Sequence, residues 1–448
     1  MKLYDKELSS FMEEGRQISL FSIALPKHLE LLLSYAITTV STLILSGYSE
    51  TATAAVGVAN TFFLLCLQLT HMISLGVSIV MSAELGRKNR ERAGRIAGTG
   101  FFLAILICVI FLLLSCFATE HIIKSFSLDA QTHPIAVSYL RIRLATTIIP
   151  VLQSYISTLL ICNGFAIIST ATNIASAIAN ALLCFFFLYS PSVPAFFSGT
   201  DGVAYAAVLS QVLPLIASIL FLWRLRCPFR FRFCLPEVTR ILRIGCPAGM
   251  TTFSFSLASF LTTGFISGLG NAAINAKTYA QTIMQFTPFS LAFGQATGVL
   301  VGRLRGQKDF LRIRALYRQN LRFTTLGNLL LSLIAFVLHR PLLSLFTTDE
   351  TTLLLGGTIL GIDVLLEVAR AINHISENTL NANGDTVCCF LTSVLCCWGC
   401  SVLLGYIFAV TLGWGLTGLW IAYTANEAFK AIAYIIRFKS GRWQSKRI

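Results

Sequence analysis

Charged residues are scarce in this chain of 448 residues, where Asp, Glu, Lys and Arg together make up 12%. Soluble domains carry about 25%, roughly twice that share. Hydrophobic residues instead make up 55% of the chain. Many of these apolar side chains must face lipid, so the composition excludes an ordinary soluble domain.

Several motifs of soluble enzymes and pumps are also missing. The sequence has no Walker A pattern, no Gly-x-Ser-x-Gly elbow and no His-Glu-x-x-His helix, so ATP-driven pumping and hydrolysis by these routes have no support. The first sixteen residues have no apolar core of a signal peptide. We expect them to remain as an interfacial cytoplasmic helix.

Long apolar runs are what the chain does have. A membrane helix needs about 20 largely apolar residues, whereas a membrane β-barrel would show short alternating segments of about 10 residues. The sequence predicts an all-α integral membrane fold with twelve transmembrane helices. The expected spans are residues 17–46, 51–82, 97–117, 135–160, 166–189, 203–223, 240–268, 272–302, 319–340, 353–380, 387–411 and 415–437.

The 34 Lys and Arg residues predict the orientation, because short loops rich in these residues stay in the cytoplasm. They concentrate around residues 87–95, 224–243 and 303–318 and near both ends of the chain, while Lys124 and Arg340 are the main exceptions. We therefore expect both termini in the cytoplasm. The formal charge of +14 is spread over all inner loops, which favours topology over nucleic-acid binding as its cause.

Matching features recur about 220 residues apart and predict an internal duplication. Pro26 pairs with Pro247, Gly86 in GRKN pairs with Gly306 in GQKD, and the Asn-Gly pair at 163–164 matches the pair at 383–384. Six helices in each half imply two bundles related by a pseudo-twofold axis along the membrane normal, around a central cavity that alternating access can expose to either side.

The duplication also predicts the domain organisation. We expect an N-terminal six-helix lobe at residues 1–225, a cytoplasmic linker at 226–239 and a C-terminal six-helix lobe at 240–448.

The tenth span contains an unusual charged stripe. Asp363, Glu367, Arg370, His374 and Glu377 follow one another at spacings of four, three, four and three, so they share one helical face. Ionisable residues within a membrane are energetically unfavourable and are functional candidates by default. The carboxylates outnumber the one obligate cation, which suits a protonation site or a sodium ion held by oxygen atoms.

Two alternatives stay open for this stripe. Arg370 could neutralise Glu367 and Asp363 in an ion-pair network that only holds helices together. Asp363 could instead lie at the outer water boundary. Asn373 lies next to the stripe and joins the candidate binding residues.

Further candidates lie in the first span, where Glu30 follows Pro26 by four residues. Pro26 and Pro247 are candidates for gating, because a proline frees a backbone carbonyl or bends its helix, although each could simply start a helix. Other polar residues could line a cavity or join helices: Asn60, Gln68, Gln153, Asn173, Asn180, Gln211, Gln281, Gln285 and Glu427. We interpret the Cys residues around 388–400 as packing residues, not as a metal site.

The whole chain resembles the bacterial multidrug and toxic compound extrusion (MATE) transporters. The resemblance rests on ALPKHLELLL with Pro26 and Glu30, AAVGVAN at 54–60, AELGRKN at 83–89, GQATGVLVGRLRGQ, and LNANGDT at 380–386. IDVLLEVARAIN is similar to a tenth-helix pattern of one bacterial branch, which places Asp363, Glu367 and Arg370 on matching positions, with Asn373 at its end. Many bacterial members carry an acid midway along the first helix, where this chain has Ser41.

The resemblance implies export of amphipathic compounds, often organic cations, in exchange for protons or sodium ions. We therefore expect an antiporter and not an enzyme, with no cofactor besides the coupling ion, in contact with membrane lipids. We further expect a monomer in the bacterial inner membrane that binds no nucleic acid. The alternatives are a lipid-linked precursor flippase of the same superfamily and an intramembrane enzyme that uses His374 with Glu377 or Glu367 as an acid-base pair.

Overall fold

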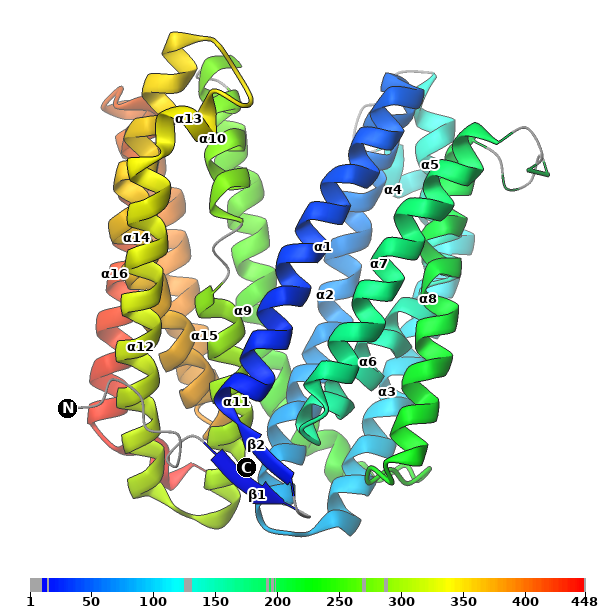
Figure 1. Ribbon diagram of the computed structural model, residues 1–448, viewed down its shortest axis with the longest axis vertical. Helices are drawn as coiled ribbons and strands as arrows, with labels where there is room; N and C mark the ends of the chain where they lie inside the picture. Colours follow the sequence, from blue (N-terminus) through cyan, green and yellow to red (C-terminus); the bar gives the residue numbers. More distant parts are fainter. Residues whose placement is uncertain are drawn as a thin grey trace. The chain divides into compact units, whose positions relative to one another are not determined.

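The computed structural model describes residues 10–13, 16–124, 131–190, 193–194, 197, 199–267, 271–285 and 289–446, and these are almost entirely helical (Figure 1). The first half contains α1 (Leu20–Tyr48), α2 (Glu50–Gly86), α3 (Arg90–Phe117), α4 (Thr119–Lys124), α5 (Thr132–Ala145), α6 (Ile148–Cys162), α7 (Ala166–Tyr189) and α8 (Gly199–Arg224). The second half contains α9 (Leu235–Ser267), α10 (Asn271–Met284), α11 (Phe289–Gln307), α12 (Phe310–Val337), α13 (His339–Leu343), α14 (Glu350–Ala382), α15 (Thr386–Cys396) and α16 (Gly415–Lys439).

Each of the twelve predicted spans coincides with one of these helices or with a consecutive pair, which confirms the all-α membrane fold. Within the described residues, nine helices are long and apolar enough to cross a membrane, and the α5–α6 pair, bent by 47°, brings the number to ten. The bend follows Ala145, and Pro150 lies in the first turn of α6, where its missing N–H is tolerated. The eleventh span continues beyond α15 as two π-helical segments, Cys397–Leu404 and Ile407–Thr411.

Where the structure describes the N-terminal segment, at residues 10–13 and from residue 16, it is not the interfacial helix that we expected. Strand β1 (Ser10–Glu13) pairs antiparallel with β2 (Arg16–Ser19), and α1 begins directly after β2. Residues 1–9 lie outside the described part of the chain. The polar and charged sequence was the basis of the helix prediction, but it contains no helical apolar period that would favour a helix over a hairpin.

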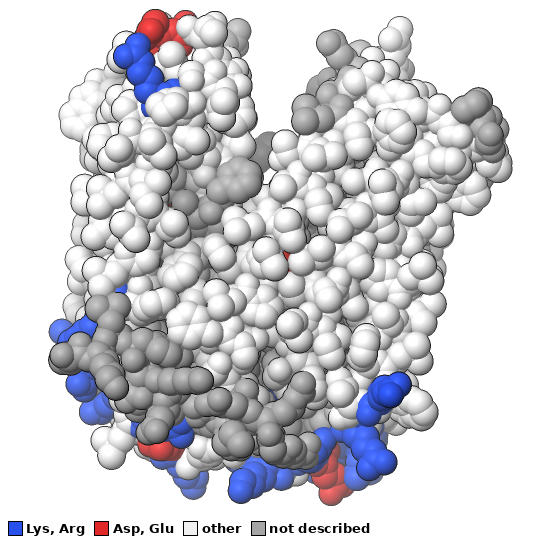
Figure 2. All heavy atoms as spheres, viewed as in Figure 1, with Lys and Arg blue, Asp and Glu red and all other residues white. Residues whose placement is uncertain are grey.

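The chain divides into two compact units. One contains residues 29–81 and 89–242, and the other contains residues up to 28, 82–88 and 243–448. The apolar core of the first unit includes Phe63, Phe111 and Tyr139. The core of the second includes Leu360 and Trp420 around α14, which contacts α10, α11, α12 and α16. Figure 2 shows most of the visible Lys and Arg at the lower end of the view and a smaller group of basic and acidic residues at the upper left, while the visible side walls are almost free of charge.

Matching turns show the internal repeat in the structure. Lys88 and Lys308 have left-handed φ values of 60° and 61°, which are uncommon for residues other than glycine. The next residue in each case, Asn89 or Asp309, caps the following helix by accepting a hydrogen bond of 3.0 Å from the backbone N–H three residues later. The sequence pairing of GRKN with GQKD therefore corresponds to the same local conformation.

The second pair of repeated motifs also adopts one conformation. Gly164 and Gly384 have φ values of 82° and 83°, just after α6 and α14 end. The residue after each glycine donates a hydrogen bond to a carbonyl five positions earlier, at 2.9 and 3.0 Å. This is a Schellman-type helix end, which requires the left-handed conformation that glycine adopts most easily.

The glycines of the first repeated motif lie in a reciprocal helix contact. A Cβ atom at Gly86 would lie 2.1 Å from the carbonyl oxygen of Arg303, and one at Gly306 would lie 2.0 Å from that of Ala83. Each glycine therefore packs against the residue three positions before the other. Only a residue without a side chain allows α2 and α11 to approach this closely.

The connection between α8 and α9 is held against α3. The backbone N–H of Arg230 donates to the Gly94 carbonyl at 3.0 Å, and Thr99 donates to the Arg232 carbonyl at 3.3 Å. Arg92 also pairs with Glu237 at 2.9 Å. A Cβ atom at Gly98 would lie only 1.7 Å from the Arg230 carbonyl oxygen.

We expect the substitution Gly98→Ala to detach this connection from α3, because the new methyl group would occupy the position of the Arg230 backbone. Limited trypsin digestion should then cleave after Arg226, Arg230 or Arg232 roughly tenfold faster than in the wild type, since local opening governs access. Gly57→Ala is the control, because nothing lies within 4 Å of a Cβ atom there. Equal cleavage rates in the two variants would contradict the expected steric clash.

Candidate functional site

Helix α14 carries the predicted stripe through the second unit. Asp349 caps its first turn, and hydrogen bonds from the hydroxyl and backbone N–H of Thr352 hold the pKa of that carboxyl below its ordinary value. Within the helix, Asp363 and Glu367 are buried, and Arg370, His374 and Glu377 are partly buried. The polar face of α14 therefore meets neighbouring helices, while residues such as Leu365 are exposed on the opposite face.

Glu367 lies at the centre of the stripe and is shared by two helices. One carboxylate oxygen pairs with the Arg370 guanidinium one turn later on α14. The other accepts a hydrogen bond of 3.0 Å from the amide of Asn328 on α12. The side chain of Glu367 is almost completely buried, so its position is well defined by these two partners.

Asp363 does not lie at a water boundary. Its residue exposure is 5%, and one carboxylate oxygen accepts a hydrogen bond of 3.1 Å from the indole N–H of Trp420 on α16. The prediction that it could sit at the outer surface is therefore wrong. The reason is that α14 begins at Glu350, so Asp363 lies several turns inside the helix.

A second group of charges lies where α14 meets α16. Asn373 donates to a carboxylate oxygen of Glu427 at 2.6 Å, and the other oxygen of Glu427 accepts from Lys430 at 2.6 Å. Asn426 donates to that same oxygen at 3.2 Å. Glu427 and Lys430 are both buried, so the second unit holds an ion pair that sequence analysis did not predict.

The remaining two residues of the stripe have separate surroundings. His374 shares a hydrogen bond of 2.9 Å between its Nδ1 atom and the hydroxyl of Ser290 on α11. Glu377 lies within electrostatic range of Lys430 and Glu427. The α14 stripe is thus flanked by two residues of α16: Trp420 bonds to Asp363 at one end, and Lys430 lies near Glu377 at the other.

The charges on this face do not balance. Four carboxyl groups (Asp363, Glu367, Glu377 and Glu427) face two cations (Arg370 and Lys430), so acidic groups outnumber basic ones by two. We call these six charged residues the α14–α16 cluster. Ion pairing alone would account for two of its carboxylates, so the cluster has more acid than a structural network needs.

Three amide oxygens around the cluster are also available as ligands. The Oδ1 atoms of Asn328, Asn373 and Asn426 are buried, and no described residue donates a hydrogen bond to them. Buried acceptors of this kind are uncommon and are normally satisfied by water or an ion. Together with the carboxylates they provide the oxygen donors that hard cations prefer.

The first unit holds a smaller polar group around Glu30 on α1. Its carboxylate accepts hydrogen bonds from Asn173 at 3.0 Å and from Thr170 at 3.2 Å, both on α7. Gln153 on α6 donates to the Asn173 amide oxygen at 3.0 Å. Gln153 and Asn173 were candidates from sequence, and the structure places both in the surroundings of Glu30.

Pro26 and Pro247 both lie inside helices, within α1 and α9. The alternative that they start their helices is therefore wrong. Proline removes one backbone hydrogen bond inside a helix and leaves a carbonyl without its intrahelical partner. Their role in gating stays a prediction.

The residues that sequence analysis missed are Lys430, Asn328, Trp420 and Ser290. Lys430 follows Glu427 by three residues within the apolar span of α16, a spacing that could have indicated the ion pair. Trp420 and Ser290 gave no such signal, because their partners lie on other helices.

All thirteen cysteines are free, and in the described part of the chain no three His, Cys, Asp or Glu residues are grouped to hold a metal.

The fold and these buried polar groups define a polytopic α-helical membrane protein with an internal duplication. The sequence profile of the family described as MatE matches residues 26–186 and again residues 247–407. The chain therefore belongs to the MatE family. The two matches begin at Pro26 and Pro247, which confirms the predicted repeat, and membership makes the protein a membrane transporter and not an enzyme.

Individual relatives cover nearly the whole chain. The uncharacterized transporter YisQ of Bacillus subtilis is 27% identical over 96% of both chains. The probable multidrug resistance protein NorM of Thermotoga maritima is 23% identical over 96% of this chain and 93% of its own. A solved structure of the MATE transporter VcmN of Vibrio cholerae superposes with a TM-score of 0.86 at 19% identity and covers 95% of this chain and 97% of its own, which shows the shared fold.

Proposed function

We propose that this protein is an antiporter that exports amphipathic small molecules, organic cations among them, in exchange for protons or sodium ions. The observation that carries the proposal is the α14–α16 cluster, in which carboxyl groups outnumber cations by two inside the second unit. The names of several relatives as probable multidrug resistance proteins agree with this class of substrate.

In this proposal, Glu367, Asp363 and Glu377 take up the coupling ion. Glu367 and Asp363 are buried side by side on one face of α14, so a proton or a sodium ion lowers the unfavourable charge there. Arg370 limits that charge, and Asn373 and His374 shape the site. Glu30, with its Asn173 and Thr170 partners, is a second candidate site in the other unit.

Coupling requires that the ion and the solute favour different conformations of the transporter. A ligand that binds two states equally shifts neither, however tightly it binds. Uptake of a cation by the α14–α16 cluster would lower the electrostatic energy of the conformation in which the cluster is closed to water. The transporter would therefore shift toward that conformation. Pro26 and Pro247 are the proposed points at which α1 and α9 bend during this exchange.

The proposed location is the bacterial inner membrane with both termini in the cytoplasm. The basic connections between α2 and α3, between α8 and α9, and between α11 and α12 support this orientation. The protein is proposed to act as a monomer in contact with lipid.

The decisive test uses purified protein in vesicles with an imposed proton or sodium gradient and a fluorescent organic cation. We expect the wild type to move the dye against its gradient. The substitution Glu367→Gln should lower the rate roughly tenfold or more, which is the usual size of the coupling between two ligand sites. Glutamine keeps the shape and the hydrogen bond from Asn328 but removes the exchangeable charge.

Glu350→Gln is the matched control, because Glu350 lies on the same helix in an exposed pair with Arg340 and should transport normally. Melting temperatures of all three proteins are measured in parallel. If Glu367→Gln lowers only the melting temperature and transports at the wild-type rate, the cluster is a structural ion-pair network and the site assignment is wrong.

A further inference from the structure

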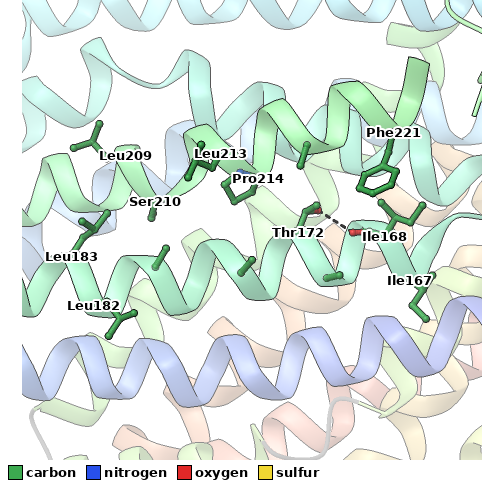
Figure 3. Close-up of a pocket in the computed structure, with 14 residues that line it drawn as sticks. Ile167, Ile168, Thr172, Leu182, Leu183, Leu209, Ser210, Leu213, Pro214 and Phe221 are labelled. Carbon is green, nitrogen blue, oxygen red and sulfur yellow. Dashed lines mark hydrogen bonds between the residues drawn. The ribbon is translucent and has the colours of Figure 1, made fainter. Parts of the chain in front are cut away.

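A groove of about 820 Å³ lies between α7 and α8 in the first unit (Figure 3). Small residues form its floor: Ala171, Ala175 and Ala179 follow one another at intervals of four on α7, and Ala217 lies on α8. Residues at this spacing share one helical face, so the floor runs along the helix axis. The volume falls in the range of about 300–1,000 Å³ found for small-molecule sites.

Large apolar side chains form the walls of the groove. Ile167 and Leu182 on α7 are 67% and 66% exposed, and Leu213 on α8 is 76% exposed. In a membrane-spanning segment, such side chains face hydrocarbon. The only polar side chains that line the groove within the described residues are Thr172 and Ser210, and the hydroxyls of both are bonded to carbonyls of their own helices.

One end of the groove is basic and aromatic. Phe221 and Ile167 lie at the same end in Figure 3, and α8 ends one turn later at Arg224. Arg224 follows Phe221 by three residues and therefore lies on the same side of α8. Arg224 is exposed, and the neighbouring Trp223 is 81% exposed, as is typical of aromatic residues at the membrane surface.

We propose that this groove binds one acyl chain of an anionic phospholipid, with the phosphate of the headgroup at Arg224. The lining residues from Leu209 to Phe221 extend for about 18 Å along α8, slightly more than one leaflet of a hydrocarbon core of about 30 Å. The chain thus fits the length and polarity of the groove. The guanidinium can form two hydrogen bonds with one phosphate and carries a positive charge. It should therefore bind a lipid with a net negative headgroup more tightly than a lipid with a neutral one.

Charge complementarity selects a lipid over the exported solute as the occupant. An organic cation would place its positive charge beside Arg224 and Arg226 or within an apolar lining, and both are unfavourable. An anionic lipid places its charge at the basic end and its chain along the alanine floor. The site is separate from the α14–α16 cluster, so its test is independent of the proposed transport function.

The test is a lipid titration of the purified, delipidated full chain followed by native mass spectrometry. Phosphatidylglycerol and phosphatidylcholine with identical acyl chains are compared. We expect the wild type to retain one phosphatidylglycerol with roughly tenfold preference over phosphatidylcholine, a difference of about 1.4 kcal/mol. Arg224→Gln should remove this preference, and Ala175→Leu should reduce retention of both lipids because its side chain fills the exposed floor.

Lys439→Gln is the charge-matched control, since Lys439 is an exposed basic residue at the end of α16 and should retain phosphatidylglycerol normally. Equal retention of the two lipids by the wild type would overturn the proposal, as would phosphatidylglycerol retention that neither Arg224→Gln nor Ala175→Leu changes. The same follows if Ala175→Leu blocks binding of an exported dye but leaves lipid retention intact, because the groove would then hold the solute.

Discussion

The substitution Gly86→Ala is expected to destabilise the protein, although alanine normally stabilises a helix by about 1 kcal/mol relative to glycine. The added Cβ atom would lie 2.1 Å from the Arg303 carbonyl oxygen and 2.8 Å from two further backbone atoms. No side-chain rotation can relieve contacts with a backbone, so α2 and α11 must separate. Overpacking of this kind typically destabilises by about 1–3 kcal/mol, which should appear as a lower melting temperature in detergent.

Gly57→Ala provides the control within the same helix, because nothing lies within 4 Å of a Cβ atom at that position. It should leave the melting temperature unchanged or raise it, so only Gly86→Ala is expected to lower it. Gly306→Ala should behave like Gly86→Ala, since its Cβ atom would lie 2.0 Å from the Ala83 carbonyl oxygen. If all three alanine variants melt alike, the close approach of α2 and α11 is not present in the membrane protein.

Much of the fold could be predicted from sequence because each span is a long apolar run, and an apolar run of that length forms a transmembrane helix. The repeat was visible because the turns at Lys88 and Lys308 and the helix ends at Gly164 and Gly384 need particular residues. The bend between α5 and α6 was not predicted. The apolar run continues through Thr146 and Thr147, so hydropathy gives no sign of the break there.

Only the part of the site that lies on a single helix could be predicted from the sequence. Glu367 and Arg370 were recognisable because charge is rare in an apolar run and their spacing places them on one face. Their partners Asn328 and Trp420 lie on α12 and α16, and such contacts depend on how helices pack in three dimensions. The ion pair of Lys430 with Glu427 was missed for the opposite reason, since a local pair looks like ordinary helix stabilisation when its burial is unknown.

The buried pair of Glu427 and Lys430 leads to the prediction with the largest expected effect on stability. The substitution Lys430→Met removes the cation 2.6 Å from the Glu427 carboxylate, and among the described residues the hydrogen bonds left to that carboxylate come from the amides of Asn373 and Asn426. Loss of one partner from a buried pair typically destabilises by about 3–5 kcal/mol, because the remaining charge stays away from water. We expect a markedly lower melting temperature and a poor yield of folded protein.

The double variant Lys430→Met with Glu427→Gln should recover most of this loss, since it removes both charges and keeps an acceptor for Asn373. It should also transport the dye close to the wild-type rate. Removal of one acid and one cation leaves Asp363, Glu367 and Glu377 against Arg370, so the cluster keeps its excess of two acidic groups. A double variant that is stable but does not transport would show that Glu427 itself takes part in ion exchange. Recovered transport would assign the pair to stability and the exchange to the acidic residues of α14.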